Sequence, residues 1–201
     1  MLRIGIYIYD NVEVLDFAGP FEVFTTASRV FLKHAKGTDS PFEVVTISRT
    51  KEAIRARAGL VIDPDFTIDN HPKLDALLIP GGVVDEELKS RSLQQWIQKI
   101  VPTTRLSASV CTGAFLLARA GLLEGKKATT HWEDIDDLKA MFPHTNVVKN
   151  VRWVDEGHII TSAGISAGID MSLHLVRRLV DNDLAEKTAR QLEFDWTQNG
   201  S

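Results

Sequence analysis

Stretches of apolar, β-branched residues alternate along the whole chain with stretches that carry apolar residues at helical spacing. The strand-like runs include residues 2–8, 42–48, 74–80 and 105–110, and helical patterns stand between them. Such alternation is typical of a largely parallel sheet with helices on both of its faces. We therefore expect an α/β fold.

The first helix is expected to follow a loop. We expect the loop over residues 9–20 and the start of the helix at Pro20, because proline suits the first turn of a helix. The buried face of this helix is predicted from its apolar residues at helical spacing: Val23, Ala27, Val30 and Phe31.

Shorter elements are expected in the middle of the chain and one long helix near its end. Hairpins are predicted to turn near Gly59 and at residues 155–157. The long helix is predicted to begin near Ser166, with Asp170 and His174 on its polar face. Its predicted apolar stripe comprises Ile169, Leu173, Val176, Leu179, Val180 and Leu184.

Composition limits the classes of partner and the number of domains. The formal net charge of −4 offers no electrostatic case for binding nucleic acid or an anionic membrane surface. The apolar start of the chain turns polar at Asp10, too early for a signal peptide or a membrane span. One cysteine cannot form an intrachain disulfide, which fits the cytoplasm. No linker interrupts the pattern, so we expect residues 1–201 to form a single domain.

That one cysteine, Cys111, stands between a predicted strand and a predicted helix. In open α/β sheets, sites form beyond the carboxyl ends of the strands. Free N–H groups at the start of a helix favour a thiolate, so we expect a reactive sulfur there. Gly82, after the neighbouring strand, is a candidate for a further backbone donor. The alternative is a cysteine that only fills space in the core, and the position by itself leaves both interpretations open.

A nucleophilic thiol also needs a proton partner. Asp16 is the best local candidate, because it is the one carboxylate in the apolar stretch VLDFAGP. A solvated loop residue or a helix cap is the competing interpretation of Asp16. Among the histidines, His131 follows a strand-like segment and is the one candidate near the active edge of the sheet. No spacing of histidines and carboxylates predicts a metal site.

Four motifs stand in a fixed order: VLDFAGPFEVF, LLIPGG, SVCTGAFLLARAGLLEGKKATTHW and ITSAGISAGIDMSLHLV. Together they resemble the DJ-1/PfpI superfamily over nearly the whole chain, and within it the isocyanide (isonitrile) hydratase branch. That branch similarly carries an aspartate in an L-D-x-x-G-P motif and a C-T-G elbow. The chain departs from the branch at Ala18, where a hydroxyl residue is frequent, and in the loop GGVVDEEL, which has no further glycine.

The resemblance implies a flavodoxin-like sandwich, usually a homodimer, with a mostly parallel sheet and helices on both faces. It implies Cys111 as the nucleophile and Asp16 as its acid/base partner. It also implies that Gly82 and Thr112 supply backbone donors and that Ile165 lines the pocket. These roles are expectations for the structure to meet.

The activity implied by the resemblance is that of a lyase that hydrates an isocyanide to an N-substituted formamide through a covalent thioimidate. The partner is then a small-molecule substrate, and no metal or organic cofactor is required. His131 matches a histidine found near the cysteine in several branches, and its part in this reaction is left open.

Two other functions stay open at this point. A glyoxalase- or deglycase-like reaction would use the same cysteine on reactive carbonyls, although Asp16 in place of the usual glutamate argues mildly against it. The other is a non-enzymatic role in redox sensing or ligand binding, as in the sensor half of AraC-type regulators. Few residues follow Trp196, so we expect no helix-turn-helix region there.

Overall fold

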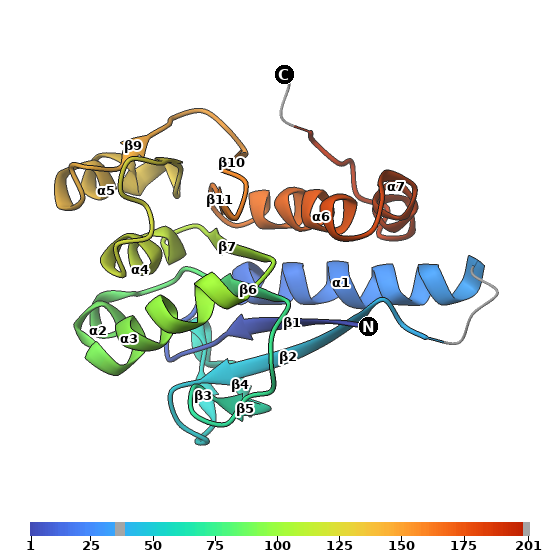
Figure 1. The fold of residues 1–201 in the computed structure, drawn as a ribbon, viewed down its shortest axis with the longest axis horizontal. Coiled ribbons are helices and arrows are strands. Elements are labelled where there is room, and N and C mark those ends of the chain that lie inside the picture. The colour runs from blue at the N-terminus through green and yellow to red at the C-terminus, as the bar shows by residue number, and fades with distance from the viewer. Residues whose placement is uncertain (35–38, 199–201) are drawn as a thin grey trace.

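A seven-stranded sheet forms the centre of the fold (Figure 1). The computed structural model describes residues 1–34 and 39–198. Within these residues the strands lie in the order β10-β11-β7-β6-β1-β2-β5, and only β10 and β11 pair in antiparallel fashion. Their bounds are β1 Leu2–Tyr7, β2 Phe42–Ser48, β5 Phe66–Thr67, β6 Ala76–Ile79, β7 Leu106–Val110, β10 Trp153–Asp155 and β11 Ile159–Ser162.

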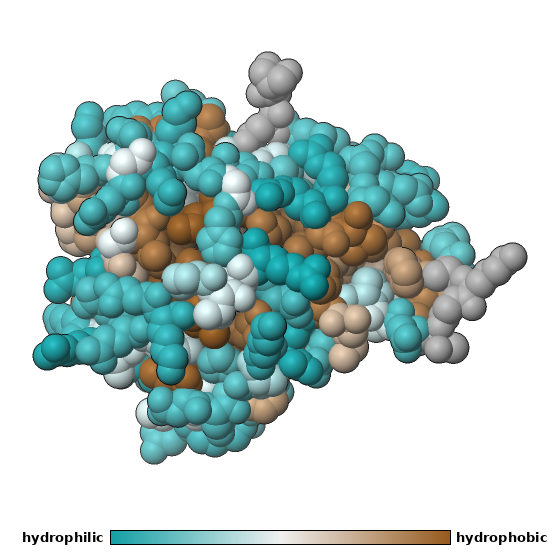
Figure 2. Space-filling view, in the orientation of Figure 1, coloured by the Kyte–Doolittle hydropathy of each residue, from teal (hydrophilic) through white to brown (hydrophobic). Residues whose placement is uncertain are grey.

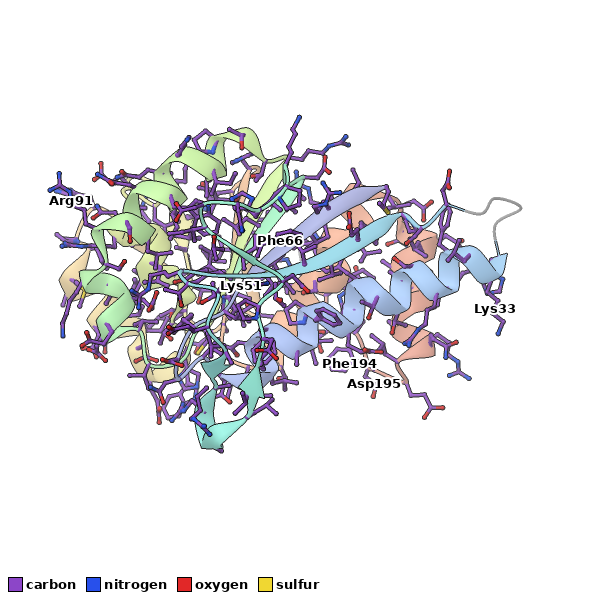
Figure 3. The ribbon with its side chains drawn as sticks, turned by 90° about the horizontal axis from the view of Figure 1, so that it is seen from below. Lys33, Lys51, Phe66, Arg91, Phe194 and Asp195 are labelled. Atoms are coloured by element: carbon purple, nitrogen blue, oxygen red, sulfur yellow. The ribbon has the colours of Figure 1, made fainter. Side chains whose placement is uncertain are left out.

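Helices cover both faces of the sheet, as the alternating pattern predicted. The chain crosses from β1 to β2 in one direction and from β6 to β7 in the other, so right-handed crossovers place their helices on opposite faces. One layer holds α1 (Val14–His34), α6 (Ala167–Leu179) and α7 (Asn182–Gln191), which pack against one another. The other holds α2 (Asp85–Lys89), α3 (Arg91–Ile100) and α4 (Gly113–Arg119). Lys33 on α1 and Arg91 on α3 mark opposite ends of the molecule in Figure 3.

Smaller elements complete the fold. An antiparallel pair, β3 (Ile54–Arg55) and β4 (Val61–Ile62), forms the hairpin predicted near Gly59. A parallel pair, β8 (Lys127–Ala128) and β9 (Asn146–Val147), flanks α5 (Ile135–Met141). Three 3-10 turns span Arg57–Gly59, Val101–Thr103 and Trp132–Asp134.

The topology fixes where a site can form. After β1, the chain adds β2 and β5 on one side of it and then β6 and β7 on the other, so the sheet has a switch point between β6 and β1. The crevice at such a switch point lies beyond the carboxyl ends of the strands. The segments that leave β1, β6 and β7 carry Asp16, Gly82 and Cys111 respectively. The buried strands beneath this edge, including Ile6, Leu78 and Ala108, hold it rigidly in place.

The prediction that the first helix opens at Pro20 was wrong. Helix α1 begins at Val14, and Pro20 lies inside it. An internal proline removes one helical hydrogen bond, but the apolar stripe continues upstream through Phe17, which is 8 % exposed. Packing of that stripe outweighs the lost bond. Asp16 therefore stands in the first turn of a helix rather than in a loop.

The predicted last helix is two helices, and two of its polar residues are buried. Helix α6 ends at Leu179, and α7 starts after Asp181, whose side chain accepts from the Leu184 N–H. Asp170 is fully buried and accepts hydrogen bonds from the Arg152 side chain. His174 is 7 % exposed, and its Nε2 lies 2.6 Å from Asp155 Oδ2. Both were predicted to face solvent. Their polar partners, distant in sequence, explain why they do not.

None of the helices within the described residues has the length and apolar character needed to cross a membrane. The same residues contain no group of three or more His, Cys, Asp or Glu side chains placed to hold a metal ion.

Candidate active site

Cys111 lies at a sharp turn between β7 and α4. Its φ is +56°, a left-handed conformation that costs an L residue about 1–2 kcal/mol. The turn is held from both sides: the Cys111 N–H donates to the Ser162 carbonyl at 3.2 Å, and its carbonyl accepts from Thr130 Oγ1 at 2.8 Å. A strained residue at the end of a strand is the geometry of a nucleophile elbow.

Two glycines let the backbone close around this turn. A Cβ on Gly113 would lie 2.0 Å from the Ile79 carbonyl oxygen, so only glycine fits where α4 starts against β6. A Cβ on Gly81 would lie 2.6 Å from the Thr112 nitrogen and 2.9 Å from Asp16 Oδ2. The loop after β6 thus packs directly against both the elbow and the carboxyl group.

Asp16 is fully buried in the first turn of α1. Its Oδ2 accepts a hydrogen bond from the Gly81 N–H at 3.0 Å. Burial raises the pKa of Asp16 to about 7; the Gly81 bond lowers it, Glu13 raises it, and the Cys111 thiol and Arg57 lower it. Oδ1 has no hydrogen-bond partner among the described residues.

The Cys111 thiol is 7 % exposed. Burial raises its pKa, and the negative charge of Asp16 raises it further, while the Thr112 backbone N–H lowers it. The start of the helix favours the thiolate, as predicted, since the Thr112 N–H lowers the pKa, but burial and the charge of Asp16 raise it more. One N–H group does not outweigh a site that is both buried and close to a carboxylate.

Thr112 and Gly82 hold each other through two hydrogen bonds. The Gly82 N–H donates to Thr112 Oγ1, and Thr112 Oγ1 donates to the Gly82 carbonyl, each at 2.9 Å. The Gly82 N–H, predicted as a donor to the substrate, is thus engaged by a side chain in this structure. The Thr112 N–H instead faces the Cys111 sulfur.

A cavity of about 210 Å³ opens beside the thiol. Five of the predicted site residues line it: Gly82, Cys111, Thr112, His131 and Ile165. Asp16, the sixth, is not part of its wall and meets the site through the thiol and Gly81. The structure therefore brings together the residues that the motifs singled out, in two tiers, one facing the cavity and one behind it.

His131 and Ile165 form one wall of the cavity. The His131 ring packs on Gly164, where an added Cβ would lie 2.0 Å from its Cδ2. Its Nδ1 lies 3.4 Å from Asp134 Oδ2. Ile165 has a φ of +54°, rare for a β-branched residue, and is 37 % exposed.

The sequence reasoning missed four polar residues of the cavity: Glu13, Arg57, Glu133 and Asp134. Glu13 and Arg57 form an ion pair, with Arg57 Nη1 3.0 Å from Glu13 Oε2. Glu13 precedes Asp16 by one helical turn, so its closeness was open to prediction. Arg57 arrives from the β3–β4 hairpin, and no local pattern signals that contact.

Comparison with known proteins agrees with this geometry. The DJ-1/PfpI family model matches residues 2–178. The chain belongs to the DJ-1/PfpI family. An isonitrile hydratase from Pseudomonas putida is 33% identical over 96% of this chain and 78% of its own length. A THiJ/PfpI family protein from Pseudomonas syringae has a similar structure, with a TM-score of 0.84, 28% identity, and coverage of 98% of this chain and 76% of the other.

The chain is also similar to regulators of transcription. The HTH-type transcriptional regulator GbdR of Pseudomonas aeruginosa is 28% identical over 98% of this chain. The chain spans 52% of the length of that regulator. Family membership therefore establishes the fold, and the reaction has to be inferred from the residues of the site.

Proposed function

We propose that this protein hydrates an isocyanide to an N-substituted formamide, through a thioimidate on Cys111. The observation that carries the proposal is the fully buried Asp16 carboxyl, with a pKa of about 7, interacting with the Cys111 thiol beside a cavity. A group with this pKa is present in both protonation states near neutral pH, as a proton carrier must be. The similarity to an isonitrile hydratase supports the choice of substrate.

The first step joins the sulfur to the substrate. The Asp16 carboxylate takes the thiol proton as the sulfur attacks the terminal carbon of R–N≡C. Asp16 then gives that proton to the same carbon, which leaves the thioimidate Cys–S–CH=N–R. The thiol needs this base because its pKa is raised, so little thiolate exists beforehand.

The second step adds water and releases the product. Asp16, again a carboxylate, takes a proton from water as the oxygen attacks the thioimidate carbon, and passes that proton to the nitrogen. The C–S bond of the tetrahedral species Cys–S–CH(OH)–NH–R then breaks, the hydroxyl proton passes through Asp16 to the departing sulfur, and the formamide R–NH–CHO leaves. The sum is R–N≡C plus water to R–NH–CHO, which requires no oxidant, reductant or cofactor.

The other predicted residues support these steps. The Thr112 N–H, which lowers the pKa of the thiol, stabilises the negative charge that develops on the sulfur. Gly82 becomes a donor to the tetrahedral species when its N–H turns from Thr112 Oγ1. Ile165 provides an apolar wall of the cavity, and no proton transfer in this mechanism is assigned to His131.

The test is product formation by the purified protein. We expect it to convert p-nitrophenyl isocyanide to the formamide, followed by mass spectrometry, and Cys111→Ala to lose this activity by at least about a thousandfold. Cys111→Ala turning over the isocyanide at the wild-type rate would refute the proposal. Failure of the wild-type protein on a panel of isocyanides would do so as well.

The panel also contains methylglyoxal, because one observation favours a carbonyl substrate. Glu13 and Arg57 make part of the cavity wall polar, and polar side chains suit a carbonyl substrate better than an apolar one. Conversion of methylglyoxal, without conversion of any isocyanide, would assign the glyoxalase-like reaction instead.

We also propose that the protein works in the cytoplasm as a homodimer. Figure 2 shows apolar residues gathered over α6 and its border with α1, and Leu15 and Ile165 are 38 % and 37 % exposed. A contiguous apolar patch on the surface is a candidate interface. Light scattering after size exclusion measures the mass directly, and a mass of one chain at micromolar concentration would contradict the dimer.

A further inference from the structure

A second and larger cavity continues from the nucleophile cavity. It measures about 650 Å³ and runs as a groove between α2, α4 and α5, which lie side by side in Figure 1. Gly82, Thr112 and Asp134 belong to the walls of both cavities. A molecule held at the thiol can therefore extend into this groove.

The smaller cavity cannot hold the whole of a large substrate. Its 210 Å³ accommodates the reacting group and a few further atoms, whereas clefts for whole small molecules usually span about 300–1,000 Å³. The groove supplies the missing volume. Its floor and sides are largely apolar, formed by Val83, Val84, Leu88, Phe115, Ala140 and Met141.

The charged residues of the groove all have the same sign. Asp85, Asp134 and Asp137 line it, and no lysine or arginine is among its lining residues in the part of the chain that the structure describes. Asp85 and Asp137 are exposed and form no ion pair there. The charge of Asp137 acts on Asp134: burial raises the pKa of the Asp134 carboxyl, His131 lowers it, and Asp137 raises it.

We propose that this groove binds the substituent of the substrate and favours an apolar substituent that ends in a positive charge. The apolar walls bury the body of the substituent, and the carboxylates at the rim attract a cation and repel an anion. The inference rests on the proposed function, since it assigns the thiol end to the isocyanide carbon. It adds a preference for cationic substituents, which does not follow from family membership.

The first experiment compares three phenylalkyl isocyanides of equal length: neutral, trimethylammonium-terminated and carboxylate-terminated. We expect kcat/KM to fall in the order cationic, neutral, anionic. Asp137→Asn should reduce the ratio of cationic to anionic substrate about two- to fivefold, as for one exposed charge. The matched control is Asp136→Asn, which removes the same charge from the same helix outside the groove. Equal effects of the two variants, or no change in either, would overturn the proposal.

A second variant tests the volume of the groove. Ala140→Trp should fill it and raise KM for the long substrates, with methyl isocyanide affected less than about twofold. Equal losses for long and short substrates would mean that the groove does not hold the substituent.

The last experiment does not depend on turnover, so it separates failure of this inference from failure of the proposed function. Iodoacetamide alkylates Cys111, and the rate is measured with added phenylpropyltrimethylammonium or phenylbutyrate. The cationic probe should slow alkylation, and the anionic probe should do so at several times higher concentration. Asp137→Asn should reduce the difference between the concentrations of the two probes that give equal protection, and Asp136→Asn should not. Equal protection by both probes would refute the preference even in a protein that hydrates isocyanides.

Discussion

Asp16 Oδ2 accepts a hydrogen bond from the Gly81 N–H at 3.0 Å, and this bond ties the start of α1 to the loop after β6. The carboxyl group is thereby fixed at the switch point of the sheet, one residue away from the Gly82–Thr112 pair. The rigid position matters because a proton carrier acts only within hydrogen-bond reach of both its partners.

We predict that kcat/KM for the isocyanide rises with pH around an apparent pKa of about 7. The rise follows ionisation of Asp16, because only the carboxylate can take the thiol proton. Asp16→Asn should lower kcat/KM by at least about a hundredfold and remove the rise. The measurement is a pH series from 5.5 to about 8.5 in constant ionic strength. A profile that is flat between pH 6 and about 8 would contradict this role of Asp16.

The same carboxyl group should make folding stability depend on pH. Its pKa is about 7 in the folded protein and about 3.9 in an unfolded chain, so the folded state binds more protons in between. The free energy of unfolding therefore falls as pH rises from about 4 to about 7. The Asp16→Asn variant has no carboxyl group at this position, so its free energy of unfolding should not fall in this way. We expect its stability relative to wild type to grow by about 1–4 kcal/mol between pH 4.5 and about 8.

Urea unfolding at the two pH values measures that difference. Asp136→Asn serves as the control, because its carboxyl is exposed and its pKa is lowered by Lys149. A variant at Asp16 whose stability tracks that of wild type at both pH values would show that the carboxyl is not the buried titrating group.

Alkylation of the thiol should become faster when its carboxylate neighbours are removed. The charge of Asp16 raises the pKa of Cys111, and Asp134 raises it by less. We therefore expect iodoacetamide at pH 8 to react severalfold faster with Asp16→Asn than with wild type, and Asp134→Asn to lie in between. Because burial is the largest cause, both variants should still react more slowly than free cysteine. Intact mass reports the reaction directly, since the chain has one cysteine.

The sequence predicted the strands of the sheet more accurately than the burial and ionisation of titratable side chains. Apolar runs such as residues 42–48 mark buried strands without ambiguity, and the ends of the predicted strands place Cys111 and Asp16 at the same edge of the sheet. Pro20 misled, because a local preference for the start of a helix was overridden by burial of Phe17 one turn earlier. Which side of a helix is buried depends on the whole fold.

Long-range partners set the limit of such reasoning. Asp170 was placed on the surface because its binding partner Arg152 lies in the loop before β10, 18 residues upstream. The Cys111 thiol was expected to ionise because its position in the sequence reveals the helix terminus but neither its burial nor the carboxylate that raises its pKa. The catalytic roles themselves remain predictions.

The Thr112 hydroxyl should matter to both stability and activity. Thr112→Val removes both hydrogen bonds to Gly82 and leaves its N–H without that acceptor, which costs about 1–3 kcal/mol. The loosened loop should lower kcat/KM about tenfold, in proportion to about 1.4 kcal/mol of positioning. Thr112→Ser keeps the hydroxyl and should stay within about twofold of wild type. Equal activity of the valine and serine variants would show that the pair does not position the loop.

Gly113→Ala should be far more damaging than its small size suggests. The new methyl group would lie 2.0 Å from the Ile79 carbonyl oxygen and 2.9 Å from that of Pro80, and backbone atoms cannot rotate away as a side chain can. We expect a loss of at least about 3 kcal/mol in the free energy of unfolding, measured in urea. Gly125→Ala is the control: its φ is +70° but nothing lies within 4 Å of an added Cβ, so only backbone strain of about 1 kcal/mol applies. Equal losses in the two variants would mean that conformation rather than close approach selects glycine at the elbow, and that the contact between β6 and the start of α4 does not hold Cys111 in place.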